Sequence, residues 1–246
     1  MINSQEIIDS IKSVINFNKE SGIIPIHEPF FKGSNAYKYV KNCLDTGWVS
    51  SSGEWVTKFE QSIQSFTKSK YAIVVSNGTV ALRLALFLVG VEEDCEVLMP
   101  PLSFVATANA VSHLGALPHF VDIDAQSLGL CPKALDKRLN EVADFKDDIL
   151  INKYTGRKIG AVVPVHVFGL PANINEIKNI CEKWKLPLVE DAAEALGSRV
   201  KDSKEFKHCG CFGDFGILSF NGNKIITSGG GGALLTNDKE LALSAK

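Results

Sequence analysis

The spacing of apolar and polar positions changes at about Lys70, and the change separates two kinds of segment. Before this point apolar residues recur every three or four positions, which predicts amphipathic helices over residues 3–18, 34–45 and 55–66. The first of these helices and the break that follows it predict an N-terminal helical extension over residues 1–23.

From there on, short apolar runs alternate with amphipathic runs. The predicted strands are residues 71–75, 96–99, 119–122, 159–165 and 188–191. The predicted helices are residues 81–88, 103–114, 132–142 and 174–184. Strands that are apolar on both faces and alternate with helices indicate an α/β fold with a doubly wound, mostly parallel sheet. We therefore expect one large domain over residues 24–246, with a polar surface loop over residues 144–158.

The composition narrows the classes of function. The chain has 246 residues, of which 45% are hydrophobic and 22% are charged, so it can bury a substantial core. The formal net charge of -2 and the scattered lysines give no basic surface of the kind that binds nucleic acid. No apolar run approaches the roughly 20 residues of a membrane span, and the N-terminus lacks the features of a signal peptide. We expect a cytoplasmic protein that binds neither nucleic acid nor membranes.

The six cysteines are too widely spread to predict a disulfide framework, and we expect free thiols. His208, Cys209 and Cys211 form the one local cluster of metal-ligating residue types. A structural zinc site usually takes two pairs of ligands at defined spacing, and the sequence offers no second pair. We therefore predict no metal site.

A strand, a turn of small residues and a helix make a candidate anion site at Ser76-Asn77-Gly78-Thr79. The first N–H groups of a helix have no acceptor within it, and the helix dipole places partial positive charge at the same end. The segment matches neither glycine-rich fingerprint for nucleotides, so a phosphate group is a better candidate than a nucleoside triphosphate or a dinucleotide. The alternative is an ordinary capped helix, with Asn77 or Thr79 as the capping residue.

Two ionisable residues, His166 and Asp191, also follow predicted strands. Ligands in doubly wound sheets bind beyond the carboxyl ends of the strands, so both residues could share an edge with Gly78 and Thr79. Two alanines follow Asp191 and leave room for a flat ring, on which its carboxylate could hold a proton at a heteroaromatic nitrogen. Asp191 could equally cap a helix, and His166 could equally be a hydrogen-bonded core residue.

Lys224 lies in an apolar and glycine-rich stretch over residues 213–232. Its apolar neighbours Phe220, Ile225 and Ile226 would reduce the hydration of a charged amine and favour the neutral, nucleophilic form that a Schiff base requires. The glycines that follow would let the backbone approach a ligand closely. The alternative is a lysine at the end of a buried strand that extends its ammonium group to water.

Four motifs occur together in the order and spacing of one protein family. They are Ser76-Asn-Gly-Thr79, Pro101-Leu-Ser-Phe104, Glu190-Asp-Ala-Ala-Glu194 and Ser219-Phe-Asn-Gly-Asn-Lys224, the last followed by the glycine run. Over residues 24–246 the chain resembles the DegT/StrS family of pyridoxal-phosphate-dependent sugar-nucleotide aminotransferases, which have the type I fold of aspartate aminotransferase. Four motifs in register are far more specific than any one of them.

The resemblance implies a role for each matching position. Lys224 would form the Schiff base with pyridoxal 5'-phosphate and move the proton between substrate and cofactor, while Asp191 would pair with the pyridine nitrogen. The other cofactor-binding positions would be Gly78, Thr79 and Ser219 at the phosphate, Phe104 and Ala193 on the two ring faces, and Glu194, where relatives often have Gln or His, near the ring.

The resemblance also implies substrates and partners. Around His27-Glu28-Pro29 and Ser50-Ser51 the chain is most similar to the branch that aminates UDP-linked 4-keto-6-deoxy-N-acetylamino sugars for legionaminic-type nonulosonic acids of surface polysaccharides. A nucleotide-linked 4-keto-6-deoxy sugar would be the substrate and glutamate the amino donor. The protein would be a homodimer, because sites in this family take residues from both subunits.

The chain departs from the family pattern in two ways. Relatives usually have Gly-Glu-Gly-Gly where this chain has four glycines at residues 229–232, and they continue much further, into a smaller C-terminal domain. We expect that domain to be missing here, since the chain stops at Lys246. Two other functions therefore stay open. One is an inactive fragment that binds cofactor or serves assembly, and the other is a sugar dehydratase, although that branch has histidine in place of Lys224.

Overall fold

The computed structural model describes residues 3–14, 28–203 and 205–246. Contacts between residues divide the chain into a unit of residues 1–34 and a larger unit of residues 35–246. Among the helices of the described part, none combines the length and the apolar composition that crossing a membrane requires.

The first unit contains helix α1 (Ser4–Val14), which agrees with the beginning of the helix predicted over residues 3–18. The remainder of that predicted helix and the predicted domain boundary fall among residues 15–27, outside the described part. The division into an extension over residues 1–23 and a domain over residues 24–246 therefore stays a prediction.

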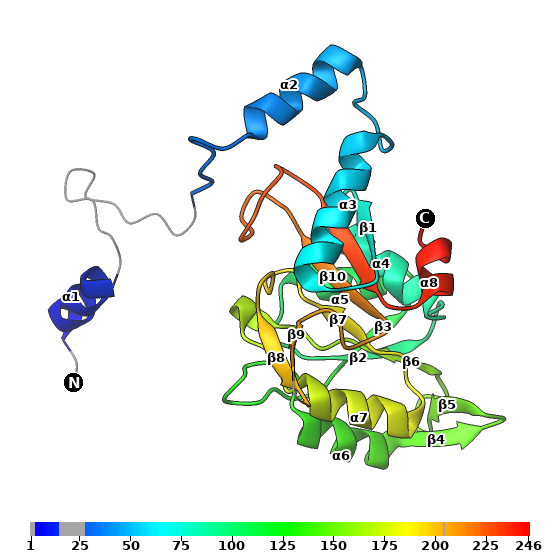
Figure 1. Ribbon diagram of the computed structural model, residues 1–246. Coiled ribbons are helices and arrows are strands. Elements are labelled where there is room, and N and C mark those ends of the chain that lie inside the picture. Colours follow the sequence, from blue (N-terminus) through cyan, green and yellow to red (C-terminus); the bar gives the residue numbers. More distant parts are fainter. Residues whose placement is uncertain (1–2, 15–27, 204) are drawn as a thin grey trace. The chain divides into compact units, whose positions relative to one another are not determined.

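The second unit alternates helices and strands (Figure 1). Its helices are α2 (Ala36–Thr46), α3 (Glu54–Thr67), α4 (Gly78–Leu88), α5 (Val105–Ser112), α6 (Pro132–Val142), α7 (Ile174–Trp184) and α8 (Lys239–Ser244), with a short 3-10 turn, η1 (Val167–Gly169). Its strands are β1 (Tyr71–Val75), β2 (Glu96–Met99), β3 (Leu117–Phe120), β4 (Ala143–Lys146), β5 (Ile149–Asn152), β6 (Ile159–Val162), β7 (Val189–Asp191), β8 (Arg199–Asp202), β9 (Glu205–His208), β10 (Phe215–Ser219) and β11 (Gly232–Thr236).

The main strands form a mostly parallel sheet in two hydrogen-bonded parts, with the orders β1-β11-β10-β7 and β3-β2-β6. Parallel bridges from Val162 to Leu188 and from Val165 to Asp191 join the two parts between β6 and β7. Within this sheet β11 runs antiparallel to both of its neighbours, and the other pairs are parallel. The predicted doubly wound, mostly parallel α/β fold is therefore confirmed.

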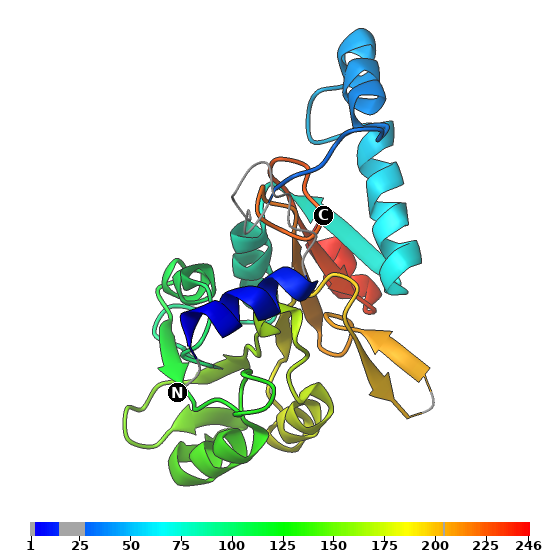
Figure 2. The same cartoon turned by 90° about the vertical axis from the view of Figure 1, so that its left-hand side faces the viewer.

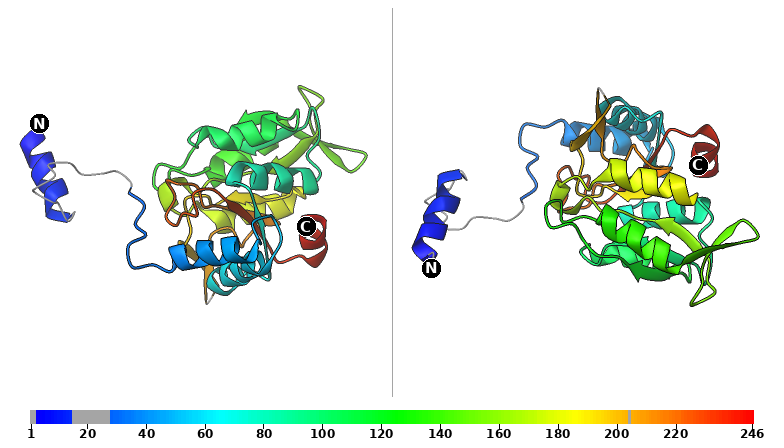
Figure 3. Two further views of the ribbon diagram at one scale, coloured as in Figure 1. Left: turned by 90° about the horizontal axis from the view of Figure 1, so that it is seen from above. Right: turned by 90° about the horizontal axis from the view of Figure 1, so that it is seen from below.

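Helices cover both faces of the sheet, and successive side chains of a strand point to opposite faces. In β2, Val97 and Met99 pack into one apolar cluster with α4 and α5, whereas Leu98 packs into a second cluster with α6 and α7. Helices α6 and α7 lie side by side in Figures 1 and 3. A third cluster, around Leu218 and Leu235, lies under α3, which runs beside β1 in Figure 2. These two-sided contacts explain why the strands are apolar throughout.

Most predicted elements lie where the spacing placed them. Helices α6 and α7 and strands β1 and β2 have the predicted bounds. Strand β3 begins two residues earlier than predicted and includes Pro118, which is tolerated because β3 is at the edge of the sheet. Strand β6 ends at Val162 rather than Val165, and Pro164, which has no backbone N–H, interrupts the ladder there.

The prediction of a surface loop over residues 144–158 is wrong, because β4 and β5 form an antiparallel hairpin there. Asp147 and Asp148 make its two-residue turn with positive φ values of 49° and 62°, the conformation that tight hairpin turns require. Leu150 is buried and anchors the hairpin on the domain. The charged residues on the exposed face concealed this alternation in the sequence.

Strands β8, β9 and β11 and helix α8 were not predicted, and β10 was considered only as the buried strand in the alternative for Lys224. These elements are short, and they lie in charged or glycine-rich sequence. So few positions do not establish a period of two or of 3.6 residues.

Candidate active site

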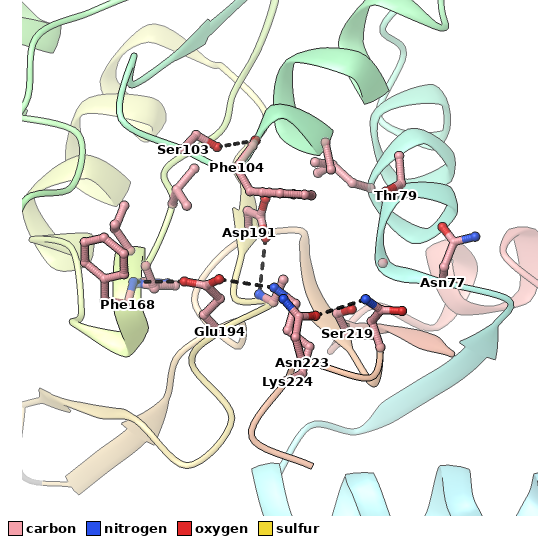
Figure 4. A pocket seen from close by; sticks show the side chains of 18 of the residues that line it. Asn77, Thr79, Ser103, Phe104, Phe168, Asp191, Glu194, Ser219, Asn223 and Lys224 are labelled. Carbon is pink, nitrogen blue, oxygen red and sulfur yellow. Dashed lines mark hydrogen bonds and ion pairs between the residues drawn. The ribbon is translucent and has the colours of Figure 1, made fainter. Parts of the chain in front are cut away.

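Strands β1, β2, β6, β7 and β10 end at the same edge of the sheet, and the segments that follow them enclose a cavity of about 500 Å³. This is the edge at which doubly wound sheets bind ligands. All of the residues that the sequence predicted as site residues line this cavity: Gly78, Thr79, Phe104, Asp191, Ala193, Glu194, Ser219 and Lys224. Figure 4 shows the labelled members of the set from close by. The role of each residue stays a prediction.

The first turn of α4 supplies a candidate anion site on the cavity wall. Asn77 caps the helix, since its Oδ1 accepts a hydrogen bond from the backbone N–H of Val80 at 2.9 Å. The N–H groups of Gly78 and Thr79, the first two residues of the helix, have no acceptor within it. Ser219 is so close that a Cβ added to Gly78 would lie 3.0 Å from the Cβ of Ser219. The capping hypothesis thus holds for Asn77, and the turn still offers donors beside a serine hydroxyl.

Phe104 presents an aromatic ring at the cavity. The residue has an extended backbone, with φ −73° and ψ 143°, and α5 begins directly after it. Phe104 is 67% exposed. Its ring centroid lies 5.8 Å from Nζ of Lys224, within the range of a cation–π contact. A flat ligand near Lys224 would therefore meet an aromatic face.

Asp191 ends β7 and is buried. Its Oδ2 accepts a hydrogen bond from Oγ1 of Thr107 at 2.8 Å, and its Oδ1 accepts one from the backbone N–H of Ala193 at 3.2 Å. Burial raises the pKa of Asp191 above its ordinary value, against the hydrogen bonds from Thr107 and Ala193, which lower it. Among the ion pairs of the described residues none includes Asp191. A buried carboxylate with only neutral donors would gain stability from a cationic partner.

Lys224 lies in the loop after β10, and its Nζ is 3.2 Å from Oε1 of Glu194. The other carboxylate oxygen of Glu194 accepts a hydrogen bond from the backbone N–H of Phe168 at 3.1 Å. The side chain of Lys224 is 11% exposed and therefore does not extend into water. Of the three apolar neighbours that the sequence suggested, Phe220 is buried, whereas Ile225 and Ile226 are more than half exposed. A carboxylate, rather than an apolar wall, meets the lysine amine.

Glu190, one residue before Asp191, is fully buried and points to a different set of partners. Its two oxygens accept backbone N–H groups of Gly210, Phe212 and Gly213 at 2.6 to 2.9 Å, and Oε2 is 3.0 Å from Nε2 of His166. Burial alone would raise the pKa of Glu190, but these hydrogen bonds outweigh burial and lower it. Glu190 therefore stays ionised inside the protein.

His166 is a core residue that is hydrogen-bonded on both ring nitrogens. Hydrogen bonds to Cys209 and Glu190 raise its pKa against the effect of burial. The backbone N–H of Ala172 donates to Nδ1 at 3.1 Å, however, and leaves no place for a second proton. We therefore assign one proton to the ring, on Nε2, from which it is donated to Glu190. His166 lines the same cavity as Gly78 and Thr79, as the sequence predicted, and it is at the same time a buried, hydrogen-bonded core residue.

Thr107 and Phe168 shape the site and were missed in the sequence. Thr107 contacts Asp191 from α5, and Phe168 has a positive φ of 55° in the turn that Glu194 holds. Nothing in the sequence separates Thr107 from other threonines in helices. Phe168 precedes a glycine, which is a weak signal for a turn.

Comparison with known proteins places the chain in a family. A model of the DegT/DnrJ/EryC1/StrS aminotransferase family matches residues 32–246. The chain belongs to this family. A curated relative, GDP-perosamine synthase from Vibrio cholerae, is 38% identical over 215 residues, which cover 87% of this chain and 53% of that protein. The chain thus spans about half the length of the curated relatives that it matches.

Solved structures of similar proteins agree with the fold. The aminotransferase TlmJ from Streptoalloteichus hindustanus has a TM-score of 0.76 and 30% identity, and the match covers 91% of this chain and 56% of that one. NtdA from Bacillus subtilis, solved with bound cofactor PMP, has a TM-score of 0.69 and 26% identity, with 95% of this chain and 50% of that one covered. The expectations of the type I fold and of pyridoxal phosphate as the family's cofactor are confirmed.

The residues at the cavity fit pyridoxal phosphate. Its phosphate could accept hydrogen bonds at the first turn of α4 beside Ser219, and its aromatic ring could stack on the exposed face of Phe104. Its pyridine nitrogen can carry a proton and would be the cationic partner that Asp191 lacks among the described residues. Lys224 lies at the same cavity and would supply the amine.

The Glu190 network predicts a specific dependence of stability on substitution and pH. In Glu190→Gln one carboxylate oxygen becomes an NH₂ group, which faces backbone N–H groups and cannot accept hydrogen bonds from them. We therefore expect a loss of about 3 kcal/mol or more in the free energy of unfolding at pH 7. The pKa of Glu190 is lowered on folding from 4.5, so its contribution is complete above about pH 4.5 and is lost as pH falls further. Urea unfolding at several pH values measures both effects.

Glu182→Gln is the matched control for this measurement. Glu182 forms an exposed ion pair with Lys178 at 3.7 Å, and its loss should change the unfolding free energy by less than about 1 kcal/mol. A Glu190→Gln variant as stable as this control would contradict the network. A difference between parent and Glu190→Gln that grows below pH 4 would contradict the lowered pKa.

Proposed function

We propose that this chain is the cofactor-binding part of an aminotransferase that transfers an amino group to a nucleotide-linked 4-keto-6-deoxy sugar. The observation that carries the proposal is the placement of Lys224, Asp191 and the first turn of α4 on the wall of one cavity. Membership of the aminotransferase family supports it. Glutamate as the amino donor and a cytoplasmic location, both expected from the sequence, belong to the same proposal.

Pyridoxal phosphate, when bound, supplies a carbonyl group for an amine and a ring that accepts electrons. The N–H groups of Gly78 and Thr79 and the hydroxyl of Ser219 would bind its phosphate, where the helix dipole favours negative charge. Asp191 would hold a proton on the ring nitrogen, and burial would strengthen this contact because water does not compete. Phe104 would cover one face of the ring.

Lys224 would serve as nucleophile and as the group that moves a proton. Its amine must be neutral to attack a carbonyl group, and it can take up a proton once it is free again. Glu194 lies 3.2 Å from Nζ and would stabilise the protonated form between these steps. The hydrogen bond from Phe168 keeps the Glu194 carboxylate in place.

Two alternatives differ from this proposal in testable ways. A sugar dehydratase of the same fold would have histidine at the position of Lys224, so the lysine argues against it. An inactive cofactor-binding module would keep the cavity residues and lack turnover. Cofactor attachment and turnover therefore have to be measured separately.

Cofactor attachment should occur on Lys224. Purified protein mixed with pyridoxal phosphate is expected to show the visible absorption of lysine-bound cofactor, and borohydride reduction followed by peptide mapping should find the adduct on Lys224. Lys224→Ala should abolish both signals, because no other lysine lines the described cavity. Lys183→Ala, which removes a surface lysine paired with Asp136, should keep them. An adduct on another lysine would overturn the assignment.

Turnover should identify the substrate class. The sequence favours a UDP-linked N-acetylamino keto sugar, whereas the name of the Vibrio cholerae relative points to a GDP-linked sugar. We expect an amino-sugar product from one of the two when glutamate is supplied, detected by mass spectrometry. Asp191→Asn should still carry bound cofactor when pyridoxal phosphate is in excess, although with weaker affinity, and should lose turnover by a factor on the order of a hundred or more. Bound cofactor with no product from either sugar would favour the inactive module.

We also propose a homodimer, supported by the exposed apolar face of α2. Tyr37, Val40 and Leu44 recur at helical spacing on this helix and are all exposed. Such a stripe is typical of an interface. Leu44→Glu is expected to weaken the dimer at least about tenfold in sedimentation, while Lys38→Glu, which lies off the stripe, should not. A parent protein that is monomeric at high concentration would contradict the proposal.

A further inference from the structure

Thr107 has an uncommon hydrogen-bond partner for a threonine in a helix. Its side chain lies in α5 and the residue is 1% exposed. A helical threonine usually bonds a carbonyl group of the preceding turn. Thr107 instead bonds Oδ2 of Asp191 at 2.8 Å, a residue 84 positions later in the chain.

The direction of this hydrogen bond follows from the donors that are present. An ionised carboxylate only accepts, so Thr107 must donate its single hydroxyl proton to Asp191. Oγ of Ser103 lies 2.5 Å from Oγ1 of Thr107 and 2.9 Å from the carbonyl oxygen of Phe104, so its single proton is shared between these two acceptors. The proton of Thr107 is therefore committed to the carboxylate of Asp191, whereas Ser103 has a second acceptor for its own proton.

The other groups that face Asp191 leave Thr107 as its one side-chain donor among the described residues. The backbone N–H of Ala193 bonds Oδ1 at 3.2 Å. Lys224 influences Asp191 by charge but is paired with Glu194, and the uncharged ring of His166 is bonded to Glu190. Burial therefore raises the pKa of a carboxylate that accepts hydrogen bonds from two neutral donors only.

We propose that Thr107 is a positioning residue that keeps the Asp191 carboxylate ionised and turned toward the ring nitrogen of the cofactor. The hydroxyl fixes Oδ2 on the α5 side while Ala193 fixes Oδ1, so the carboxylate has one orientation. The proposal rests on the proposed function, because the state of Asp191 affects the reaction only if a protonated ring nitrogen meets it.

Thr107→Val tests the proposal, because valine keeps the shape of threonine and removes the hydroxyl. In cofactor-free protein labelled with ¹³C at aspartate carboxyl groups, the NMR titration of Asp191 should move up by about one to two pH units, since a hydrogen bond to a charged group is lost. Asp191→Asn identifies the signal. Thr107→Ser, which restores the hydroxyl, should titrate within about 0.5 units of the parent.

Binding of pyridoxal phosphate gives an independent reading. Thr107→Val should bind about ten- to a hundredfold more weakly at neutral pH, and the loss should grow as pH falls because Asp191 becomes protonated sooner. Thr107→Ser should bind like the parent, and Ser103→Ala should lose less affinity for pyridoxal phosphate than Thr107→Val, because Thr107 can still donate its hydrogen bond to Asp191.

The outcomes separate this proposal from the proposed function. An unchanged Asp191 titration in Thr107→Val would overturn the role of Thr107, whatever the affinity for cofactor. If the parent took up no pyridoxal phosphate, the proposed function would fail, and with it the role of Thr107 at a cofactor. If the valine variant does not fold, Thr107→Ala removes the same hydroxyl with a smaller side chain. The titration of Asp191 and the affinity for cofactor are then measured in that variant.

Discussion

The junction between β6 and β7 is the contact on which the rest of the site depends. The backbone N–H of Asp191 donates to the carbonyl oxygen of Pro164 at 2.9 Å, and the backbone N–H of His166 donates to the carbonyl oxygen of Asp191 at 3.0 Å. These bonds join the two parts of the sheet beside the cavity. The buried pair of Glu190 and His166 reinforces the same junction from the side chains. Without it Asp191 would have no fixed distance to α5, and the carboxyl ends of the strands would not meet at one edge.

Three carboxylates within five residues have three different environments, and these differences decide what the site can bind. Glu190 is satisfied by backbone N–H groups and the ring of His166, and Glu194 is paired with Lys224. Asp191 is buried with neutral donors only. Since a buried carboxylate gains most from a cation, Asp191 is the one with capacity for a positively charged ligand atom. Glu190 and Asp191 are neighbours on β7, and the opposite directions of their side chains give one a structural environment and place the other at the cavity.

Part of the fold and of the site was accessible from the sequence. The parallel sheet was predicted from strands that are apolar on both faces and from helices with periodic apolar positions. A strand that is buried on both faces needs an apolar residue at every position, so its sequence is a continuous apolar run. The turn at Gly78 and Thr79 and the carboxylate of Asp191 stood out because they lie at the ends of predicted strands, and Lys224 stood out because it lies in an apolar and glycine-rich stretch. The hairpin over residues 143–152 did not stand out, since its period is hidden by charged side chains on the exposed face.

The sequence by itself thus determined the fold class, the family and the residues that gather at the cavity. Only the tertiary structure decided which of them touch. The contact of Thr107 with Asp191 spans 84 positions, and that of Lys224 with Glu194 spans 30. It also decided that a carboxylate, rather than Ile225 and Ile226, meets the lysine amine. The physical reason is that local spacing fixes the direction of a side chain on its own element, whereas its partners depend on how distant elements pack.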